Sequence, residues 1–498
     1  MSAIITEKFR QHNADQFVES FTEASNSTYY LFVGKATAYT SATTGGSDSS
    51  PPAPADATGD TEFYAWDSML AAKNVTSADV SYAVPRRNWA NGDTYDMYDD
   101  DISSSSTTTS GASNLYDSTF YFMTSDYRVY KVLDNNAGAA YSGAEPTSTS
   151  TSPFELGGYV LKYMYQVTTS EAAKYLTSDF IPVSDDSTIT AAATDGGIES
   201  LKITAGTGYT NGTYYAAIYG DGTSAGTSSG GIVRITVSGG TIQSFGLTAG
   251  SDTTIHAGGA AYTFGTVNLA SGYTFSDSGL SSTSAIGGSG GEIEVVISPK
   301  NGHGFSAIKE LGGHYVMTAT TLTQAENDDI TTSNDFRQVG LVVDPTTYGT
   351  STVASSSTAR QTYVIKASSV SGTFEVDEKI TQATSGAVGK VVEYDSTLSL
   401  LYYQQERFGD FGTNSTTGDH SVFTGTNVIT GATSSATFTP SANSETITLA
   451  NNNTLATTSG YANPELQPDS GNIVYLENRK PIQRDSDQTE DIKLIIEF

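Results

Sequence analysis

The chain has 498 residues, enough for several domains of ordinary size. Its 54 acidic and 24 basic residues give a formal charge of −30, which disfavours binding to nucleic acids and to anionic membrane surfaces. The sequence has no cysteine, which excludes disulfides, thiolate nucleophiles and cysteine-bound metals. Neither a signal peptide nor a membrane-spanning run is predicted, so we expect a soluble protein made in a cytoplasm.

Abundant Tyr, Thr, Gly and Ser predict a mostly β protein with a smaller α/β part. Apolar residues at helical spacing favour a short helix over 13–21, capped by Asn13. A buried strand is expected over 29–33, a Ser/Gly/Pro-rich loop over 41–60 and a second helix over 61–73. Later strands are expected at 120–123, 128–133, 159–167, 292–298, 336–343, 473–476 and 492–496.

Two regions contain internal repeats. Residues 196–206 return at 240–250, with the shared pattern I-x-S-apolar-x-apolar-T-A-G. A different pattern, F-x5-I-T-x-A-T-S-x-A, occurs at 374–387 and again at 423–436. Alternating apolar residues between turn residues predict one duplicated β-unit in each region. Because loops tolerate insertion where their ends lie close together, we expect both regions to be inserted modules.

These patterns predict a multi-domain chain in which a β-sandwich-like core carries two inserted β-repeat modules. The final strand, 492–496, is expected to pair with strands of the N-terminal part, in preference to a hairpin with 473–476. The expected segments are an N-terminal α+β and β core at 1–187, the first module at 188–290, a continuation of the core at 291–348, the second module at 349–466, and closing strands at 467–498.

Several motifs resemble the baseplate wedge subunit of T-even-type contractile-tail phages, the gene product eight family. They are V-P-R-R-N-W at 84–89, F-R-Q-V at 336–339 and I-V-Y-L-E-N-R at 473–479, in the order of that family. The opening T-E-K-F-R at 6–10 and the strand at 159–167 are similar to that family as well. The two repeat-rich regions lie outside the resemblance.

The resemblance implies a structural virion protein of the tail baseplate, assembled in the host cytoplasm. It implies a homodimer that contacts other baseplate wedge proteins and holds them in register during assembly and contraction. It brings no catalytic activity, cofactor or metal. The residues that it marks for partner contact or as family motifs are Pro85, Arg86, Arg87, Trp89, Phe336, Arg337, Glu477, Asn478 and Arg479.

The charged and aromatic motif residues also have simpler interpretations. In so acidic a chain, Arg86 and Arg87 are expected to pair with carboxylates, inside the fold rather than across an interface. Trp66 and Trp89 are expected in the core rather than at a contact surface. The five carboxylates between Asp93 and Asp101 lack the spacing of a calcium loop, so a solvated loop is expected there.

Motifs of catalysis and of metal binding are weak. Residues 287–291 read G-G-S-G-G and match the nucleophile-elbow pattern, but that elbow needs a strand before it and a helix after it, and here a strand is expected to follow. The five histidines form no ligand pair, and His303 is expected in a turn.

Two other functions remain open. Gly/Ser/Thr-rich β-repeats also suit a receptor-binding or adhesive tail protein that contacts host surface glycans. A glycan-processing enzyme would need two carboxylates at a fixed separation, which the sequence alone does not place.

Overall fold

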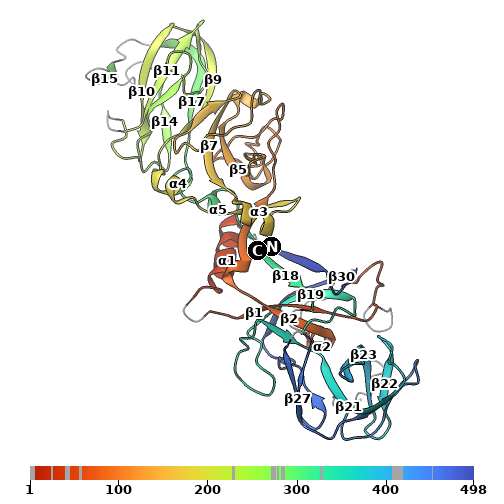
Figure 1. Cartoon of the computed structure of the whole chain (residues 1–498). Coiled ribbons are helices and arrows are strands. Elements are labelled where there is room, and N and C mark those ends of the chain that lie inside the picture. The colour runs from red at the N-terminus through yellow and green to blue at the C-terminus, as the bar shows by residue number, and fades with distance from the viewer. Residues whose placement is uncertain are drawn as a thin grey trace. The chain divides into compact units, whose positions relative to one another are not determined.

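The computed structural model describes residues 6–23, 26–39, 45–54, 59–226, 230–270, 276–277, 280–281, 286–325, 329–406, 419–450 and 452–498. The chain is mostly β, as the composition predicts, and it divides into two units (Figure 1). Unit 1 comprises Met1–Gln16, Ser81–Met317 and Ile495–Phe498. Unit 2 comprises Phe17–Val80 and Thr318–Leu494.

Unit 1 contains short helices and two main sheets. Its elements are α1 (Glu7–Glu19), which continues into unit 2, β3 (Val80–Pro85), η2 (Leu115–Asp117), β4 (Tyr121–Met123), β5 (Arg128–Asp134), η3 (Asn136–Gly138), β6 (Phe154–Leu156), β7 (Tyr159–Gln166), α3 (Thr169–Tyr175), β8 (Phe180–Val183), α4 (Ser187–Ala192), β9 (Ser200–Tyr209), β10 (Gly212–Gly220), β11 (Ile232–Ser238), β12 (Thr241–Ile242), β13 (Thr254–Ala257), β14 (Gly265–Val267), β15 (Ser276–Asp277), β16 (Leu280–Ser281), β17 (Gly287–Val296) and α5 (Ala307–Glu310).

Unit 2 contains an α/β part and a β-barrel. Its elements are β1 (Tyr29–Gly34), α2 (Gly59–Ser68), β2 (Met69–Val75), η1 (Ser77–Asp79), β18 (Tyr315–Thr323), β19 (Phe336–Val343), β20 (Thr358–Arg360), β21 (Tyr363–Ser371), β22 (Lys379–Gln382), β23 (Ala387–Asp395), β24 (Leu400–Gln404), β25 (Ile429–Gly431), β26 (Thr437–Pro440), β27 (Glu445–Thr448), β28 (Thr454–Thr457), β29 (Tyr461–Ala462), β30 (Asn472–Ile482) and β31 (Thr489–Glu497). Strands β18 and β31 have their other ends in unit 1.

The first sheet of unit 1 has the order β4-β5-β7-β6 and an aromatic core. Tyr95, Phe122, Tyr130 and Tyr159 are buried in one cluster on it. Aromatic rings give large buried area with little side-chain entropy to lose, which explains how a Tyr-rich chain folds without long aliphatic runs.

The second sheet of unit 1 holds the first repeat region, in the order β12-β11-β10-β14-β17-β9 with β13 beside β11. Strand β9 pairs with β17 from Ser200 opposite Val296 onward, so the first and last strands of this region lie side by side. Its core cluster also includes Leu133 and Val160 of the first sheet. The region therefore packs on β5 and β7.

Only one copy of the first repeat forms a long strand, so the expectation of two like β-units is wrong. Copy one lies in the ten-residue β9, whereas copy two forms the two-residue β12 and then leaves the sheet. Gly246 occupies the position of Lys202, and glycine weakens a strand. The Glu155 carboxylate accepts hydrogen bonds from Leu247 N and Thr248 Oγ1, which holds copy two in a turn.

The α/β part of unit 2 is a five-stranded sheet in the order β20-β2-β1-β19-β30. All six residues of β1 are buried, because both faces are covered. Tyr30 and Phe32 pack with Ala65 and Trp66 of α2, which confirms Trp66 as a core residue. Leu31 and the rest of the opposite face pack with Phe21 in a second cluster.

The second repeat region forms a closed barrel. Strand β21 pairs with both β24 and β26, which closes the ring β21-β24-β23-β22-β25-β26. The two repeat copies are the hairpins β22–β23 and β25–β26. They pair with each other antiparallel, with Thr381 opposite Thr430, and these two residues are equivalent positions of the repeat. The duplication thus generates a local pseudo-two-fold axis.

Several boundaries differ from the predicted ones. Helix α1 begins at Glu7, so the cap at Asn13 is wrong. The helix predicted over 61–73 ends at Ser68, because the apolar residues after it form β2 and pair with β1. Residues 45–54 of the predicted loop contain no helix or long strand, and 41–44 and 55–58 lie outside the described residues.

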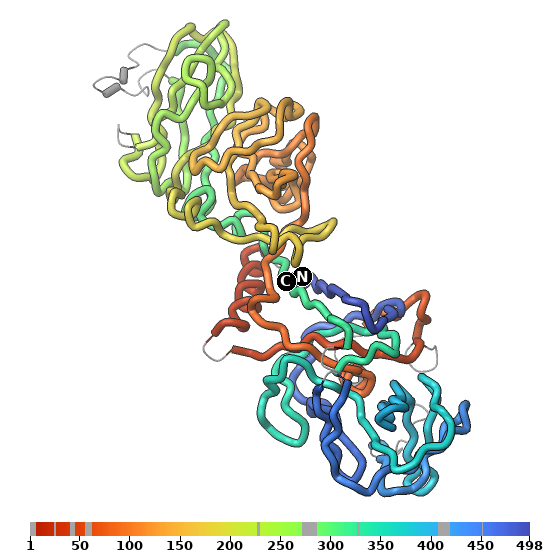
Figure 2. The backbone as a smooth tube through the Cα atoms, viewed as in Figure 1, coloured from red at the N-terminus to blue at the C-terminus, as the bar shows by residue number. Residues whose placement is uncertain are grey.

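The end of the chain also differs from expectation. Strand β31 lies beside β18 and β30 lies beside β19, so the described parts of these strands form neither a hairpin nor a pair with an N-terminal strand. The strands that receive them come from 315–343. The chain end still reaches the N-terminal helix in unit 1 (Figure 2). There Glu497 Oε1 lies 2.6 Å from Arg10 Nη1.

Candidate functional site

In unit 2 the structure brings together the F-R-Q and E-N-R motifs. Phe336 and Gln338 begin β19, and Gln338 lies opposite Asn478 of β30. Gln338 Nε2 donates to Asn478 Oδ1 at 2.9 Å, and Asn478 Nδ2 donates to the carbonyl of Pro52 at 3.0 Å. Phe336 is 1% exposed and belongs to the core. These motif residues therefore join the two strands to the segment before α2.

Arg337 is a buried structural residue. Its Nε and Nη2 atoms each lie 3.1 Å from the Asp48 carboxylate, and its Nη1 donates to the carbonyl of Ala36. The hydrogen bond from the guanidinium lowers the pKa of Asp48. Tyr39 Oη donates to the Arg337 carbonyl at 2.5 Å. A bidentate arginine of this kind fixes the segment around Asp48 against β19.

Glu477 and Arg479 are the exposed members of the set. Arg479 Nη1 lies 3.0 Å from Glu477 Oε1, and the two side chains are 50% and 36% exposed respectively. They lie on β30, at the edge of the five-stranded sheet. The unpaired backbone of an exposed edge strand can form hydrogen bonds with a strand of a neighbouring chain. Charged side chains on such a strand can also prevent this pairing.

In unit 1 the V-P-R-R-N-W motif begins with the last two residues of β3 and continues beyond the strand. Pro85 accepts a hydrogen bond from Tyr121 Oη at its carbonyl, and Arg86 Nη1 donates to the carbonyl of Thr177 at 2.7 Å. Arg87 Nη2 donates to the carbonyl of Tyr116 at 2.8 Å, and its guanidinium lies 4.5 Å from the centre of the Tyr121 ring.

The arginines of this motif therefore bind carbonyl groups rather than the expected carboxylates, within the part of the chain that the structure describes. Trp89 packs edge-on against Tyr141, with the ring centres 5.8 Å apart, and is partly buried as expected. Residues 84–89 thus connect β3 with the loops around Tyr116 and Thr177. The sequence pattern did not predict these hydrogen-bond partners.

Unit 1 contains a buried charge network that the sequence patterns did not predict. Lys131 of β5 is 0% exposed, and its Nζ lies 2.8 Å from both Glu310 Oε2 and His303 Nδ1. It also lies 3.8 Å from the centre of the Tyr98 ring. Burial lowers the pKa of Lys131, and the Glu310 carboxylate opposes this shift. His303 is in a turn as predicted, but it is fully buried there.

A second lysine extends the network. Lys162 of β7 is 1% exposed, and its Nζ lies 3.2 Å from both carboxylate oxygens of Glu199. Burial raises the pKa of Glu199. Glu199 immediately precedes β9, whereas His303 and Glu310 follow β17. The two lysines thus fix both ends of the first repeat region to β5 and β7. In the sequence, this site is indicated by a lysine inside each of two apolar strand patterns, Y-K-V at 130–132 and L-K-Y at 161–163.

The acidic run is not a simple solvated loop. Asp96 is 1% exposed and accepts hydrogen bonds from the backbone and hydroxyl groups of Ser110 and Thr119. Burial raises its pKa, but these hydrogen bonds lower it more. Asp99, Asp101 and Glu294 lie close enough together to hold a cation. Lys202 Nζ already lies 2.7, 3.2 and 2.5 Å from their oxygens, so this group forms an ion-pair cluster.

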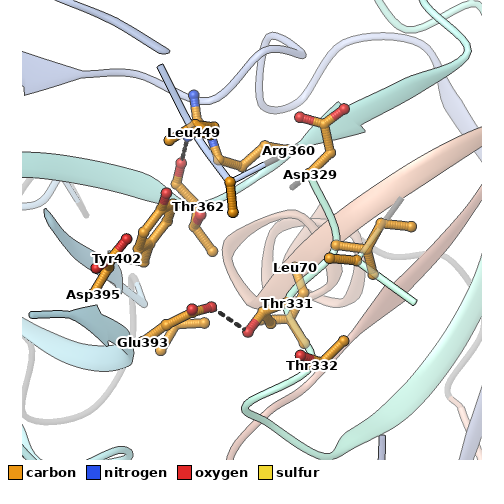
Figure 3. A pocket seen from close by; sticks show the side chains of 14 residues that line it. Leu70, Asp329, Thr331, Thr332, Arg360, Thr362, Glu393, Asp395, Tyr402 and Leu449 are labelled. Carbon is orange, nitrogen blue, oxygen red and sulfur yellow. Dashed lines mark hydrogen bonds between the residues drawn. The ribbon is translucent and has the colours of Figure 1, made fainter. Parts of the chain in front are cut away.

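The Gly-rich motif and a small cavity remain to be placed in the structure. Residues Gly287–Gly291 are part of β17 and pair with β9, so they lack the context of a nucleophile elbow. In unit 2 a cavity of about 120 Å³ is lined by Arg360, Thr331 and Glu393, among others (Figure 3). Thr331 Oγ1 donates to Glu393 at 2.7 Å, and Arg360 Nη2 donates to the carbonyl of Asn463 at 2.8 Å. These bonds hold the barrel region to its surroundings.

Comparison with protein families gives a match to Phage-Gp8, described as bacteriophage T4 Gp8, over residues 3–150 and 441–498. The match joins both ends of the chain in one family, as the motif order predicts. The chain is similar to the Phage-Gp8 family over these two segments. The match confirms the predicted resemblance and supports a structural role in the phage tail baseplate. No curated protein matches the chain.

The Gp8 match includes the V-P-R-R-N-W motif and the whole of β30 and β31. It also includes Lys131, but residues 151–440 lie outside it. The partner-contact role of the motif residues and the five-segment division of the chain stay predictions. No helix in the described residues is long and apolar enough to cross a membrane.

Proposed function

We propose that this protein works as a wedge subunit that holds neighbouring wedge proteins in register during assembly and contraction. The observation that carries the proposal is the exposed Glu477–Arg479 pair on the edge strand β30, within the matched segment. Most of the other motif residues are engaged inside the fold. The exposed pair is therefore the part of the motif set that a partner protein contacts.

The family resemblance also supports a homodimer assembled in the host cytoplasm before it joins the baseplate. Sedimentation of the full chain at micromolar concentration should give twice the 52.3 kDa chain mass. A single 52.3 kDa species would contradict the dimer while leaving the wedge role intact.

The wedge role is tested by reversing the charges of the exposed pair. We expect Glu477→Lys with Arg479→Glu to lower incorporation into wedges reconstituted from the phage's other wedge proteins. Glu375→Lys, a similar change at an exposed residue of the barrel region, is the control. Equal incorporation of all three proteins would contradict the proposed contact, and imaging of the virion tail should then locate the true one.

A further inference from the structure

The first repeat region carries a cationic and aromatic surface on the sheet face opposite its core. On β10, Tyr214, Ala216 and Ile218 belong to the core cluster. Because side chains alternate along a strand, Thr213, Tyr215 and Ala217 lie on the other face, where Tyr215 packs against the buried Ala217 and Ile232. Strands β10 and β11 lie side by side, with Tyr215 opposite Arg234 (Figure 1).

Arg234 holds this surface together. Its Nη1 donates to Thr236 Oγ1 at 3.2 Å and its Nη2 donates to Thr213 Oγ1 at 3.3 Å, so the guanidinium bridges β11 and β10. His256 of the neighbouring β13 packs edge-on against Tyr215, with ring centres 5.4 Å apart. Arg234 and Tyr215 are partly exposed, and His256 and Thr213 are exposed.

The charge of Arg234 is not neutralised by a carboxylate among the described residues, although the chain carries 54 acidic side chains. In the same unit Lys131, Lys162 and Lys202 each contact a carboxylate, and Arg86 and Arg87 donate to backbone carbonyls. Within the described part of the chain, the partners of Arg234 are threonine hydroxyls alone. An accessible guanidinium between hydroxyl groups and beside a tyrosine ring matches a ligand that offers both a carboxylate and a sugar face.

We propose that Thr213, Tyr215, Arg234 and His256 bind a carboxylate-bearing polysaccharide of the host surface. The guanidinium pairs with the uronate carboxylate, the Tyr215 ring packs against the sugar ring, and the threonine hydroxyls and imidazole contact its hydroxyl groups. Nucleic acid fits this surface poorly, because the chain's charge of −30 repels a dense row of phosphates. The surface lies outside the matched family segments, so this binding is separate from the wedge role.

The test is calorimetric titration of the full chain with a defined galacturonate oligosaccharide. We expect binding by the unaltered chain, no binding of the methyl-esterified oligosaccharide, and an affinity loss of about tenfold or more in Arg234→Gln, since charged hydrogen bonds are lost. Tyr215→Ala should also weaken binding. Lys300→Gln removes an equal charge from an exposed residue elsewhere in unit 1 and should bind normally.

Other results would overturn the proposal. One is that the unaltered chain does not bind the oligosaccharide, and another is that Arg234→Gln binds it with unchanged affinity. A third is that polyphosphate, or a protein partner that competes for the same residues, binds as tightly as the oligosaccharide. Thermal unfolding of each variant shows whether its fold is retained. Arg234→Lys should bind with intermediate affinity if the fork of the guanidinium, and not charge alone, recognises the carboxylate.

Discussion

The two duplicated regions show opposite outcomes of the same kind of sequence event. In the barrel, both copies of the repeat become hairpins, and their equivalent threonines face each other across β22 and β25. In the first repeat region, one copy becomes the long strand β9 and the other becomes a turn held by Glu155. Sequence duplication therefore gives structural symmetry only where both copies find equivalent partners.

The regions also differ in how they are attached. The first repeat region is anchored at both ends by the buried charges of Lys131, Lys162, Glu199 and Glu310. The barrel region is attached by ladder pairing of β20 with β2 and by bonds to carbonyl groups, such as Gln404 Nε2 to Met69 at 2.8 Å. Loss of one partner of a buried ion pair lowers the free energy of unfolding strongly, whereas loss of a neutral contact lowers it less.

The largest effect is expected from Glu310→Ala. This change leaves the fully buried Lys131 ammonium without its carboxylate and should lower the free energy of unfolding by about 3–5 kcal/mol. Hydrogen exchange should show the loss in peptides of 196–310, because the network anchors that region. Glu375→Ala, at an exposed position, is the control. An unchanged exchange rate would show that the network does not anchor the region.

A comparable loss is expected at either copy of the barrel repeat. Phe374 and Phe423 are equivalent residues, 4% and 5% exposed, in one core cluster. Each change to alanine should cost about 3–5 kcal/mol, and the two costs should agree to about 1 kcal/mol. Chemical denaturation measures both, with Val428→Ala, 49% exposed, as the near-neutral control. Strongly unequal costs would mean that the pseudo-symmetry is only geometric.

Acid should weaken the first repeat region through His303. Burial, together with the charges of Lys131 and Lys162, holds the pKa of His303 well below its usual range. The unfolded chain therefore takes up a proton near pH 6.5 that the folded chain does not, so stability is full above this pH and falls below it.

The fall should be at most about 2 kcal/mol between pH 6.5 and pH 5. Glu199, whose pKa burial raises, acts in the opposite direction because its folded form binds a proton first. Glu310 and the Tyr98 ring also face this group. Comparison with His303→Asn isolates the histidine: the variant's unfolding free energy should depend less on pH in this interval. Parallel pH profiles would contradict the assignment.

Much of the fold could be predicted from local pattern. The strand at 336–343 has the predicted bounds, and the buried strand at 29–33 and the β-rich repeats are present. Alternation and turn residues carry this information. The Lys131 network could not be predicted, because its members are separated by up to 179 residues and only the folded sheets bring them together.

The second helix shows the same limit. Its apolar spacing suits a helix, but Met69, Ala71 and Ala72 pair with β1, so tertiary contacts override the local preference. The first module, expected at 188–290, is also less separable from the core than an insertion would be. Leu133 and Val160 contribute to that module's core and would become exposed on its removal.

The smallest effect tests the asymmetry of the first repeat region directly. Ile203 and Leu247 are equivalent positions of the repeat. Ile203 packs against the core cluster and lies opposite Ile293 of β17, whereas Leu247 is 39% exposed in the turn held by Glu155. Truncation of a core-facing isoleucine removes packing as well as transfer free energy, while truncation of an exposed leucine removes little of either.

We therefore expect Ile203→Ala to lower the free energy of unfolding by about 2 kcal/mol and Leu247→Ala to change it by less than about 0.5 kcal/mol. Chemical denaturation of the two variants side by side measures the difference. Because the residues are sequence equivalents, the contrast depends on structure and not on residue type alone. Equal costs would mean that copy two also packs as a strand in solution. In that case Glu155→Ala, which releases the turn, should leave stability unchanged.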